Sequence, residues 1–154
     1  MAAISKETAS PEATVNVNVE KWGRALIDAG WTLVPSTLIE RQRKLGLDAV
    51  DFNILMHLLS YWWDAKNKPH PSKKRIADAL GVHPRTVQRR IAAMEKSGLI
   101  KREERTGAGK GTQTNKYDLK GLIAAATPLA KELLEERAEK RKRTRKMGPL
   151  QLVK

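Results

Sequence analysis

The chain has 154 residues, a length typical of one domain with tails, and its 30 Lys and Arg against 17 Asp and Glu give a formal charge of +13. The absence of Cys excludes disulfide scaffolds, thiolate zinc sites and cysteine nucleophiles, and no apolar run approaches the roughly 18 residues of a membrane span. Residues 1–71 are neutral overall and the whole excess lies in residues 72–154, which points to a polyanionic partner, either nucleic acid or an anionic membrane surface.

Short elements are predicted at the N-terminus. Residues 1–18 are rich in Ala, Ser, Thr and Asn without an apolar period, which is typical of a disordered leader, and they lack the layout of a signal peptide. Residues 20–30 place apolar side chains at helical spacing before Gly30, which predicts a short helix. Residues 31–34 are β-prone and stop at Pro35, which favours a short strand.

A short helix and a longer one are predicted next. Ser36 is expected to cap a helix through Lys44 that turns Leu38 and Ile39 inward. The clearest apolar face runs from about Asp48, the expected N-cap, to residue 63. The core is expected to centre on the four tryptophans of the neutral half, which are Trp22, Trp31, Trp62 and Trp63.

Two short helices joined by a tight turn are predicted over residues 73–80 and 84–97. Gly81 suits the end of the first helix, and Pro84 suits the first turn of the second, where its missing N–H costs nothing. This arrangement is the helix-turn-helix unit, although an ordinary helical hairpin with a basic solvated face is the alternative. The side chains expected to face inward are Ile76, Ala77, Leu80, Val87, Ile91 and Met94.

The outward face of helix 84–97 is basic. A face that combines arginines with Thr and Gln suits the major groove, because Arg can pair with guanine, Gln with adenine, and Thr with phosphate or the thymine methyl group. The side chains predicted to read bases are Arg85, Thr86, Gln88 and Arg89.

A β-hairpin is predicted after the second helix. Residues 100–105 are β-prone, residues 106–112 form a Gly-rich tip, and residues 116–119 return. Such a wing would follow the phosphate backbone or enter a minor groove. The side chains predicted to contact the DNA backbone, from this wing and from the two helices, are Ser72, Lys73, Lys74, Lys96, Arg105, Lys110 and Lys116.

Two motifs carry a family resemblance. Residues 80–89 read L-G-V-x-x-R-T-V-Q-R, and residues 115–119 read N-x-Y-x-L. Both resemble the winged helix-turn-helix domains of bacterial, plasmid and phage regulators and replication initiators, over roughly residues 31–122. Members of that family commonly have Ser or Thr where His83 stands, as the N-cap of the recognition helix. The resemblance implies binding of double-stranded DNA, often as a dimer, and no enzyme activity.

A basic helix is predicted near the C-terminus. Thr127 and Pro128 suit its start as N-cap and first residue. Leu129 and Leu133 are expected to dock on the domain or on a second copy, and the N-terminal extension is an alternative homodimer surface. The basic run that follows is interpreted as an arm along DNA phosphates or as a solvated tail, and no large apolar face supports a membrane role. It consists of Lys140, Arg141, Lys142, Arg143, Arg145 and Lys146.

No catalytic or ligand-binding motif is convincing. Residues 107–112 resemble a phosphate-binding P-loop, but Glu104 stands where the pattern needs Gly, and Gly111 where it needs Ser or Thr. The histidines and acidic residues do not follow metal-ligand spacing. We therefore expect no cofactor, no metal and no small-molecule ligand.

These elements predict a mainly α protein with a small β-hairpin wing, a winged helix-turn-helix followed by a basic C-terminal helix. The expected organisation is a leader (1–18), the winged domain with an N-terminal extension (19–122), the basic helix (127–146) and a tail (147–154). The expected function is non-enzymatic, sequence-specific DNA binding in transcription regulation or plasmid or phage replication or partition, in the bacterial cytoplasm or nucleoid. The alternatives are a protein-interaction adaptor and an RNA-binding protein that uses the basic tail.

Overall fold

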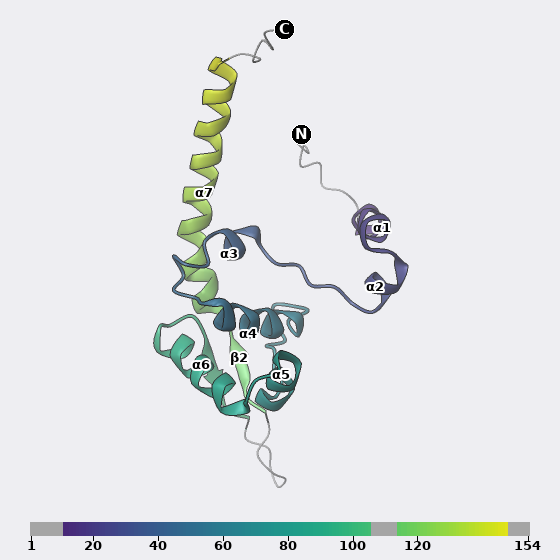
Figure 1. The fold of residues 1–154 in the computed structure, drawn as a ribbon, viewed down its shortest axis with the longest axis vertical. Helices are drawn as coiled ribbons and strands as arrows, with labels where there is room; N and C mark the ends of the chain where they lie inside the picture. The colour runs from purple at the N-terminus through teal and green to yellow at the C-terminus, as the bar shows by residue number, and fades with distance from the viewer. Residues whose placement is uncertain (1–10, 106–113, 148–154) are drawn as a thin grey trace. The chain divides into compact units, whose positions relative to one another are not determined.

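The structure is a computed structural model that describes residues 11–105 and 114–147, and its contacts divide the chain into two compact units. The N-terminal unit, residues 1–33, contains α1 (Pro11–Trp22) and α2 (Arg24–Asp28). The fold is mainly helical with one small hairpin, as predicted (Figure 1). The main unit, residues 34–154, contains α3 (Ser36–Glu40), α4 (Ala49–Ser60), α5 (Lys73–Leu80), α6 (Pro84–Lys96), β1 (Lys101–Glu103), β2 (Lys116–Asp118) and α7 (Lys120–Met147).

The segment predicted to be a disordered leader is helical in its second half. α1 begins at Pro11, a residue that suits the first turn of a helix. Val15, Val19 and Trp22 lie at i, i+4 and i+7 along it, an apolar period that the polar composition of this region conceals. The first ten residues lie outside those that the structure describes.

Two further predictions for the N-terminal region are wrong. The single helix predicted over residues 20–30 is interrupted at Gly23, whose φ of 82° lies in the left-handed region that favours glycine. The strand predicted over residues 31–34 is an irregular segment, in which Leu33 is 83% exposed. This segment has no strand to pair with, because the only strand pairing among the described residues joins β1 and β2.

α3 is shorter than predicted, and only one of its two predicted core side chains is buried. It ends at Glu40 instead of continuing to Lys44, because residues 41–46 form turns. Leu38 is buried as expected, whereas Ile39 is exposed.

α4 begins as the sequence predicts, with Asp48 as its N-cap. The Asp48 carboxylate accepts a hydrogen bond from the Asp51 N–H at 2.8 Å, and the Asp51 carboxylate accepts one from the Asp48 N–H at 3.2 Å. This reciprocal capping box satisfies donors that a helix start would otherwise leave free. The helix ends at Ser60, three residues before the predicted limit.

The core of the main unit is aliphatic, and the expectation that it centres on tryptophan is wrong. Trp22, Trp31 and Trp63 are exposed, and Trp62 is half-buried at the edge of the core. The one large aromatic ring in this core is that of Tyr117, which is 1% exposed. The least exposed side chains of the helices α4, α5 and α6 are Ile54, Leu55 and Leu58 of α4, Ile76 and Ala77 of α5, and Val87 and Ile91 of α6.

The hairpin pairs β1 with β2 in antiparallel register, with Arg102 opposite Tyr117. The Lys68 ammonium bridges both strands, because it lies 2.6 Å from the Glu103 carboxylate and 2.7 Å from that of Asp118. The predicted tip at residues 106–112 lies outside the described residues. The base of the hairpin is therefore fixed to the loop that precedes α5.

A second ion pair joins β1 to α6. The Glu95 carboxylate accepts a hydrogen bond from the Arg102 backbone N–H at 2.9 Å and another from its Nε at 2.6 Å. The Arg102 side chain, and then its backbone N–H, hold the pKa of Glu95 below its usual range. This pair fixes the direction in which the chain leaves α6.

α7 is continuous from Lys120 to Met147, so the predicted start at Thr127 and Pro128 is wrong. Pro128 cannot donate to the carbonyl four residues earlier, but the Thr127 hydroxyl donates to the Ile123 carbonyl at 2.7 Å within the same stretch. The helix-forming run of Leu, Ile and Ala before Pro128 outweighs the signal for a helix start.

The first turn of α7 lies against the turn that follows α6. A Cβ atom built on Gly121 would lie 1.9 Å from the Gly98 carbonyl oxygen, a separation that no side chain could occupy. Gly121 therefore permits a backbone-to-backbone contact between α7 and the turn that follows α6.

We predict that Gly121→Ala lowers the free energy of unfolding by about 1–3 kcal/mol, the usual cost of an overpacked site. Alanine favours a helix by about 1 kcal/mol over glycine, so an open site would be stabilised instead. The sign of the change in chemical denaturation therefore decides whether this contact exists.

We also predict that acid removes the contribution of the Glu95–Arg102 pair. Since the folded-state pKa of Glu95 is lowered, the stabilisation is present above about pH 4.5, the ordinary value for Glu, and is lost as the pH falls through the folded value. Urea unfolding between pH 7 and pH 3 should show the wild type losing its advantage over Glu95→Gln. An advantage that stays constant across this range would contradict the assignment.

Candidate nucleic-acid interface

Local hydrogen bonds cap the starts of α5 and α6, and a glycine begins the turn between them. The Ser72 hydroxyl accepts from the Arg75 N–H at 3.1 Å and caps α5, and Gly81, with φ of 65°, ends that helix. His83 caps α6, because its Nδ1 accepts from the Arg85 N–H at 3.1 Å. An imidazole thus does what Ser or Thr commonly does at this position.

α6 presents one buried face and one basic face, as predicted. Val87 and Ile91 are fully buried, and Met94 is nearly so. Thr86 and Ala92 are half-buried at the borders of the two faces. The outward residues of the helix are Arg85, Gln88, Arg89, Ala93 and Lys96.

The third arginine of α6 belongs to the scaffold. Arg90 lies 2.5 Å from the Asp48 carboxylate and 3.6 Å from that of Asp51, so it ties α6 to the capping box of α4. Burial raises the pKa of Asp51, whereas the Asp51 N–H, through its hydrogen bond, lowers the pKa of Asp48. Sequence patterns gave no signal for this pairing, which joins residues 42 positions apart.

Ion pairing divides the basic residues of the main unit into two groups. Lys68, Arg90 and Arg102 hold the scaffold together, as described above. Arg85 and Arg89 have no acidic partner among the described residues. The same holds for four further cations near them, which are Lys73, Lys96, Arg105 and Lys116.

The other residues predicted to contact the DNA backbone differ in whether their polar groups are already bound within the protein. Lys74 forms an exposed pair with Asp78 at 2.7 Å, one helical turn away. Ser72 uses its hydroxyl oxygen as a cap, which leaves its proton available to donate. Lys110 lies outside the described residues.

The first half of α7 docks on the main unit of its own chain. Leu133 is buried and Leu129 packs against the core, so both predicted docking residues are used within the chain. Three ion pairs surround this contact. They join Lys44 to Glu132 at 2.6 Å, Arg137 to Glu40 at 2.6 Å, and Arg41 to Glu136.

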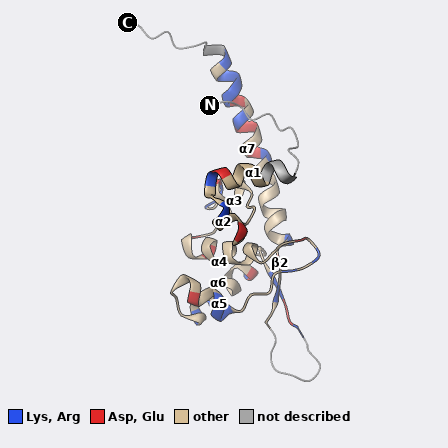
Figure 2. Ribbon diagram, turned by 90° about the vertical axis from the view of Figure 1, so that its right-hand side faces the viewer, with Lys and Arg blue, Asp and Glu red and all other residues tan. Residues whose placement is uncertain are grey.

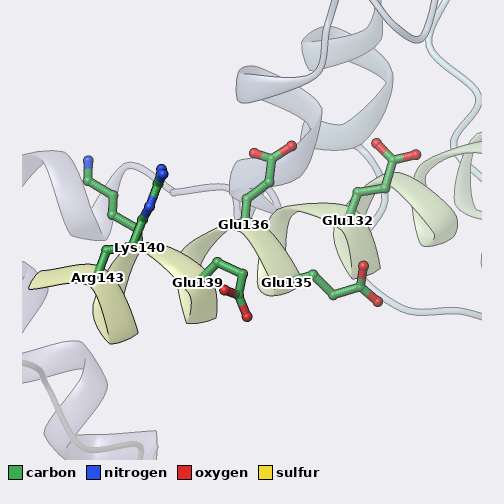
Figure 3. A pocket seen from close by; sticks show the side chains of 6 residues that line it. All are labelled: Glu132, Glu135, Glu136, Glu139, Lys140 and Arg143. Atoms are coloured by element: carbon green, nitrogen blue, oxygen red, sulfur yellow. The ribbon is translucent and has the colours of Figure 1, made fainter. Parts of the chain in front are cut away.

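The second half of α7 changes from acidic to basic. Figure 3 shows an open hollow on its surface, lined by Glu132, Glu135, Glu136, Glu139, Lys140 and Arg143. Because charged side chains of one helix form these walls, we interpret the hollow as a solvated helix face. The basic residues 140–145 are exposed, whereas the side chain of Lys146 is outside the described residues. Figure 2 shows Lys and Arg in blue along the last turns of α7.

Among the described residues, no group of three or more His, Asp or Glu side chains has a geometry that could hold a metal ion. No helix in the described part of the chain has the length and apolar character needed to cross a membrane.

Comparisons with known proteins address the fold. Residues 45–100 match the model of a family described as a helix-turn-helix domain. The N-terminal domain of the DnaD protein from Geobacillus kaustophilus is 19% identical with a TM-score of 0.50, and the match covers 82% of this chain and 96% of that one. A comparison with curated proteins gives no match.

Two other solved structures have lower TM-scores. The transcriptional regulator PA3341 is 20% identical with a TM-score of 0.40, over 84% of this chain and 89% of that one. RV1404 from Mycobacterium tuberculosis is 14% identical with a TM-score of 0.42, over 94% and 88% of the two chains.

The matched residues include α4, α5 and α6, and the hairpin of β1 and β2 follows directly. The DnaD domain shares this fold over most of its length. Residues 45–100 therefore match a helix-turn-helix domain, and with the hairpin that follows them the chain has the winged helix-turn-helix fold.

Proposed function

We propose that this protein is a non-enzymatic, sequence-specific double-stranded DNA-binding protein that places α6 in the major groove. The observation that carries the proposal is the outward face of α6, where Arg85 and Arg89 are exposed and have no acidic partner among the described residues. The opposite face of the same helix is buried, so the protein scaffold holds these arginines in a fixed direction.

The side chains of α6 suit base recognition. Arg85 and Arg89 can each donate two hydrogen bonds to guanine O6 and N7, and Gln88 can pair with adenine. Thr86 is half-buried close to the start of the helix, where its hydroxyl or methyl group can meet a phosphate or a thymine. The free N–H groups at the start of α6 favour a nearby phosphate.

The surrounding cations suit contacts with the phosphate backbone. Lys73 and Lys74 lie in the first turn of α5, and Ser72 precedes them. Lys116 and Arg105 flank the tip of the hairpin, which also contains Lys110. Together with Lys96 these groups would set the register of the protein on the duplex without reading its sequence.

A homodimer would give the protein two recognition helices and a two-part site. Leu129 and Leu133 are occupied within the chain, so we favour the N-terminal unit as the contact. Trp22 and Leu26 of this unit are 55% and 59% exposed. Such a dimer fits a bacterial regulator of transcription, or a component of replication or partition, that acts in the cytoplasm or nucleoid.

The two alternative functions, a protein-interaction adaptor and an RNA-binding protein, would use different surfaces of the molecule. A protein-interaction adaptor has no need for unpaired arginines on α6. An RNA-binding protein that relies on the basic end of α7 would bind equally well after changes to α6. Mobility shifts with duplex DNA and duplex RNA at two salt concentrations separate these cases.

We predict that Arg89→Ala reduces affinity for the cognate site by about 1–3 kcal/mol and flattens discrimination against random DNA. The site is first selected from a random duplex library, and affinities are then measured by fluorescence anisotropy. Arg43→Ala, which removes an exposed arginine from the turn after α3, is the matched control and should retain discrimination. Full discrimination by the Arg89 variant would show that α6 does not read bases.

We predict that Lys116→Ala weakens binding to all sequences by a similar factor and makes the salt dependence shallower by about one unit of log–log slope. Lys110→Ala should do the same if the hairpin tip follows the backbone. Lys66→Ala, an exposed lysine in the loop after α4, is the control and should leave the slope unchanged. An unchanged slope in the Lys116 variant would remove the hairpin from the interface.

A further inference from the structure

The basic end of α7 forms a charged surface of its own. Lys140, Arg141, Lys142, Arg143 and Arg145 are all exposed. Among the described residues only Lys142 has an acidic partner, Glu139 at 2.9 Å. The five cations are distributed around the last turns of a regular helix, and we call them the α7 basic end.

The α7 basic end projects from the main unit on the side away from α6. The last contacts of α7 with the rest of the unit are the buried Leu133 and the ion pairs of Glu136 and Arg137. Both views show α7 rising away from α5, α6 and the hairpin, which lie together at the other end of the unit (Figures 1 and 2).

The length of α7 sets the distance between the two basic surfaces. Gly121 touches the turn at the end of α6, and Lys140 lies 19 residues further along the same helix. At 1.5 Å per residue this separation is about 29 Å, and it reaches about 36 Å at Arg145. The Debye length at physiological salt is about 8 Å, so the two surfaces attract polyanions independently.

Repulsion between its own cations also destabilises the helix at the α7 basic end. Arg141 and Arg145 are one helical turn apart, and like charges at this spacing destabilise a helix. Cations near the C-terminus of a helix are favoured by the helix dipole, but no packing supports these turns. A polyanion placed alongside would remove the repulsion and stabilise the helix.

We propose that the α7 basic end binds the phosphate backbone of a second DNA duplex, so that one chain links two DNA segments. This proposal rests on the proposed function of α6. It differs from the simpler expectation that the basic run follows the phosphates of the duplex that α6 reads, because α7 carries the run to the opposite end of the unit.

The experiment is a two-duplex capture assay with the full chain. A duplex that contains the selected site is immobilised on beads, and the protein and a fluorescent duplex of random sequence are added. The fluorescence retained on the beads measures linkage, and anisotropy with the site duplex alone measures binding through α6. The test variant carries Lys140→Gln, Arg141→Gln, Arg143→Gln and Arg145→Gln.

A matched control removes four cations from other surfaces. It carries Arg43→Gln, Lys66→Gln, Lys120→Gln and Lys131→Gln, so both variants have the same net charge. We expect the wild type and the control to retain the fluorescent duplex. We expect the test variant to lose at least ten-fold in capture while its affinity for the site duplex stays within about two-fold. Capture by the wild type should decline with salt at a log–log slope of about −3.6 for four neutralised phosphates.

Other outcomes overturn the proposal. Equal losses of capture and of site affinity in the test variant would place the α7 basic end on the same duplex as α6. Unchanged capture would assign linkage to another surface, such as two α6 helices of a dimer. Preferential retention of a fluorescent RNA would identify RNA as the second ligand. If the wild type binds the site but captures nothing, this inference alone fails, whereas absence of any duplex binding refutes the proposed function as well.

Discussion

The packing of α6 against α4 and α5 is the constraint on which the rest of the site depends. Val87 and Ile91 are fully buried, and a helix that buries these two positions has only one direction left for Arg85 and Arg89. Arg90 reinforces this orientation, because its ion pairs with α4 oppose rotation of α6 about its axis. Base recognition needs such preorganisation, since a bidentate contact tolerates little angular error.

The role of a cation in this protein is indicated by whether it has an acidic partner more than by its position in the sequence. Cations that hold elements together meet carboxylates, as Lys68 does at the base of the hairpin. Most cations proposed to meet DNA have no acidic partner among the described residues, and the exceptions, Lys74 and Lys142, form exposed pairs within their own helices. A net charge of +13 therefore does not show which cations are available to phosphates or where they lie. Partly buried pairs such as Arg102–Glu95 also resist screening by salt better than exposed pairs do.

The sequence predicted α5, α6 and their turn because local signals decide these elements. Gly81, Pro84 and the apolar spacing act within a few residues, and burial confirms that spacing. Predictions failed where long-range contacts or competing local signals decide. Whether residues 31–34 form a strand depends on a partner that is absent among the described residues, and α7 continues through Pro128 because it is packed on both sides of that residue. The ion pairs of Lys68 and Arg90 join distant residues, so no local pattern could have assigned them to the scaffold.

The continuity of α7 changes the meaning of its basic end. A flexible tail with the same residues could reach the duplex held by α6, because a disordered chain can turn back within a few residues. A helix that is anchored by Leu133 and three ion pairs cannot, since its axis continues in the direction set by the docked half. Glu132 and Glu136 contribute to this docking, because they form ion pairs with Lys44 and Arg41 of the turn after α3. The position of the basic residues is thus set by the docking of residues 122–137, and a change that loosened this docking would turn a directed surface into an unspecific tail.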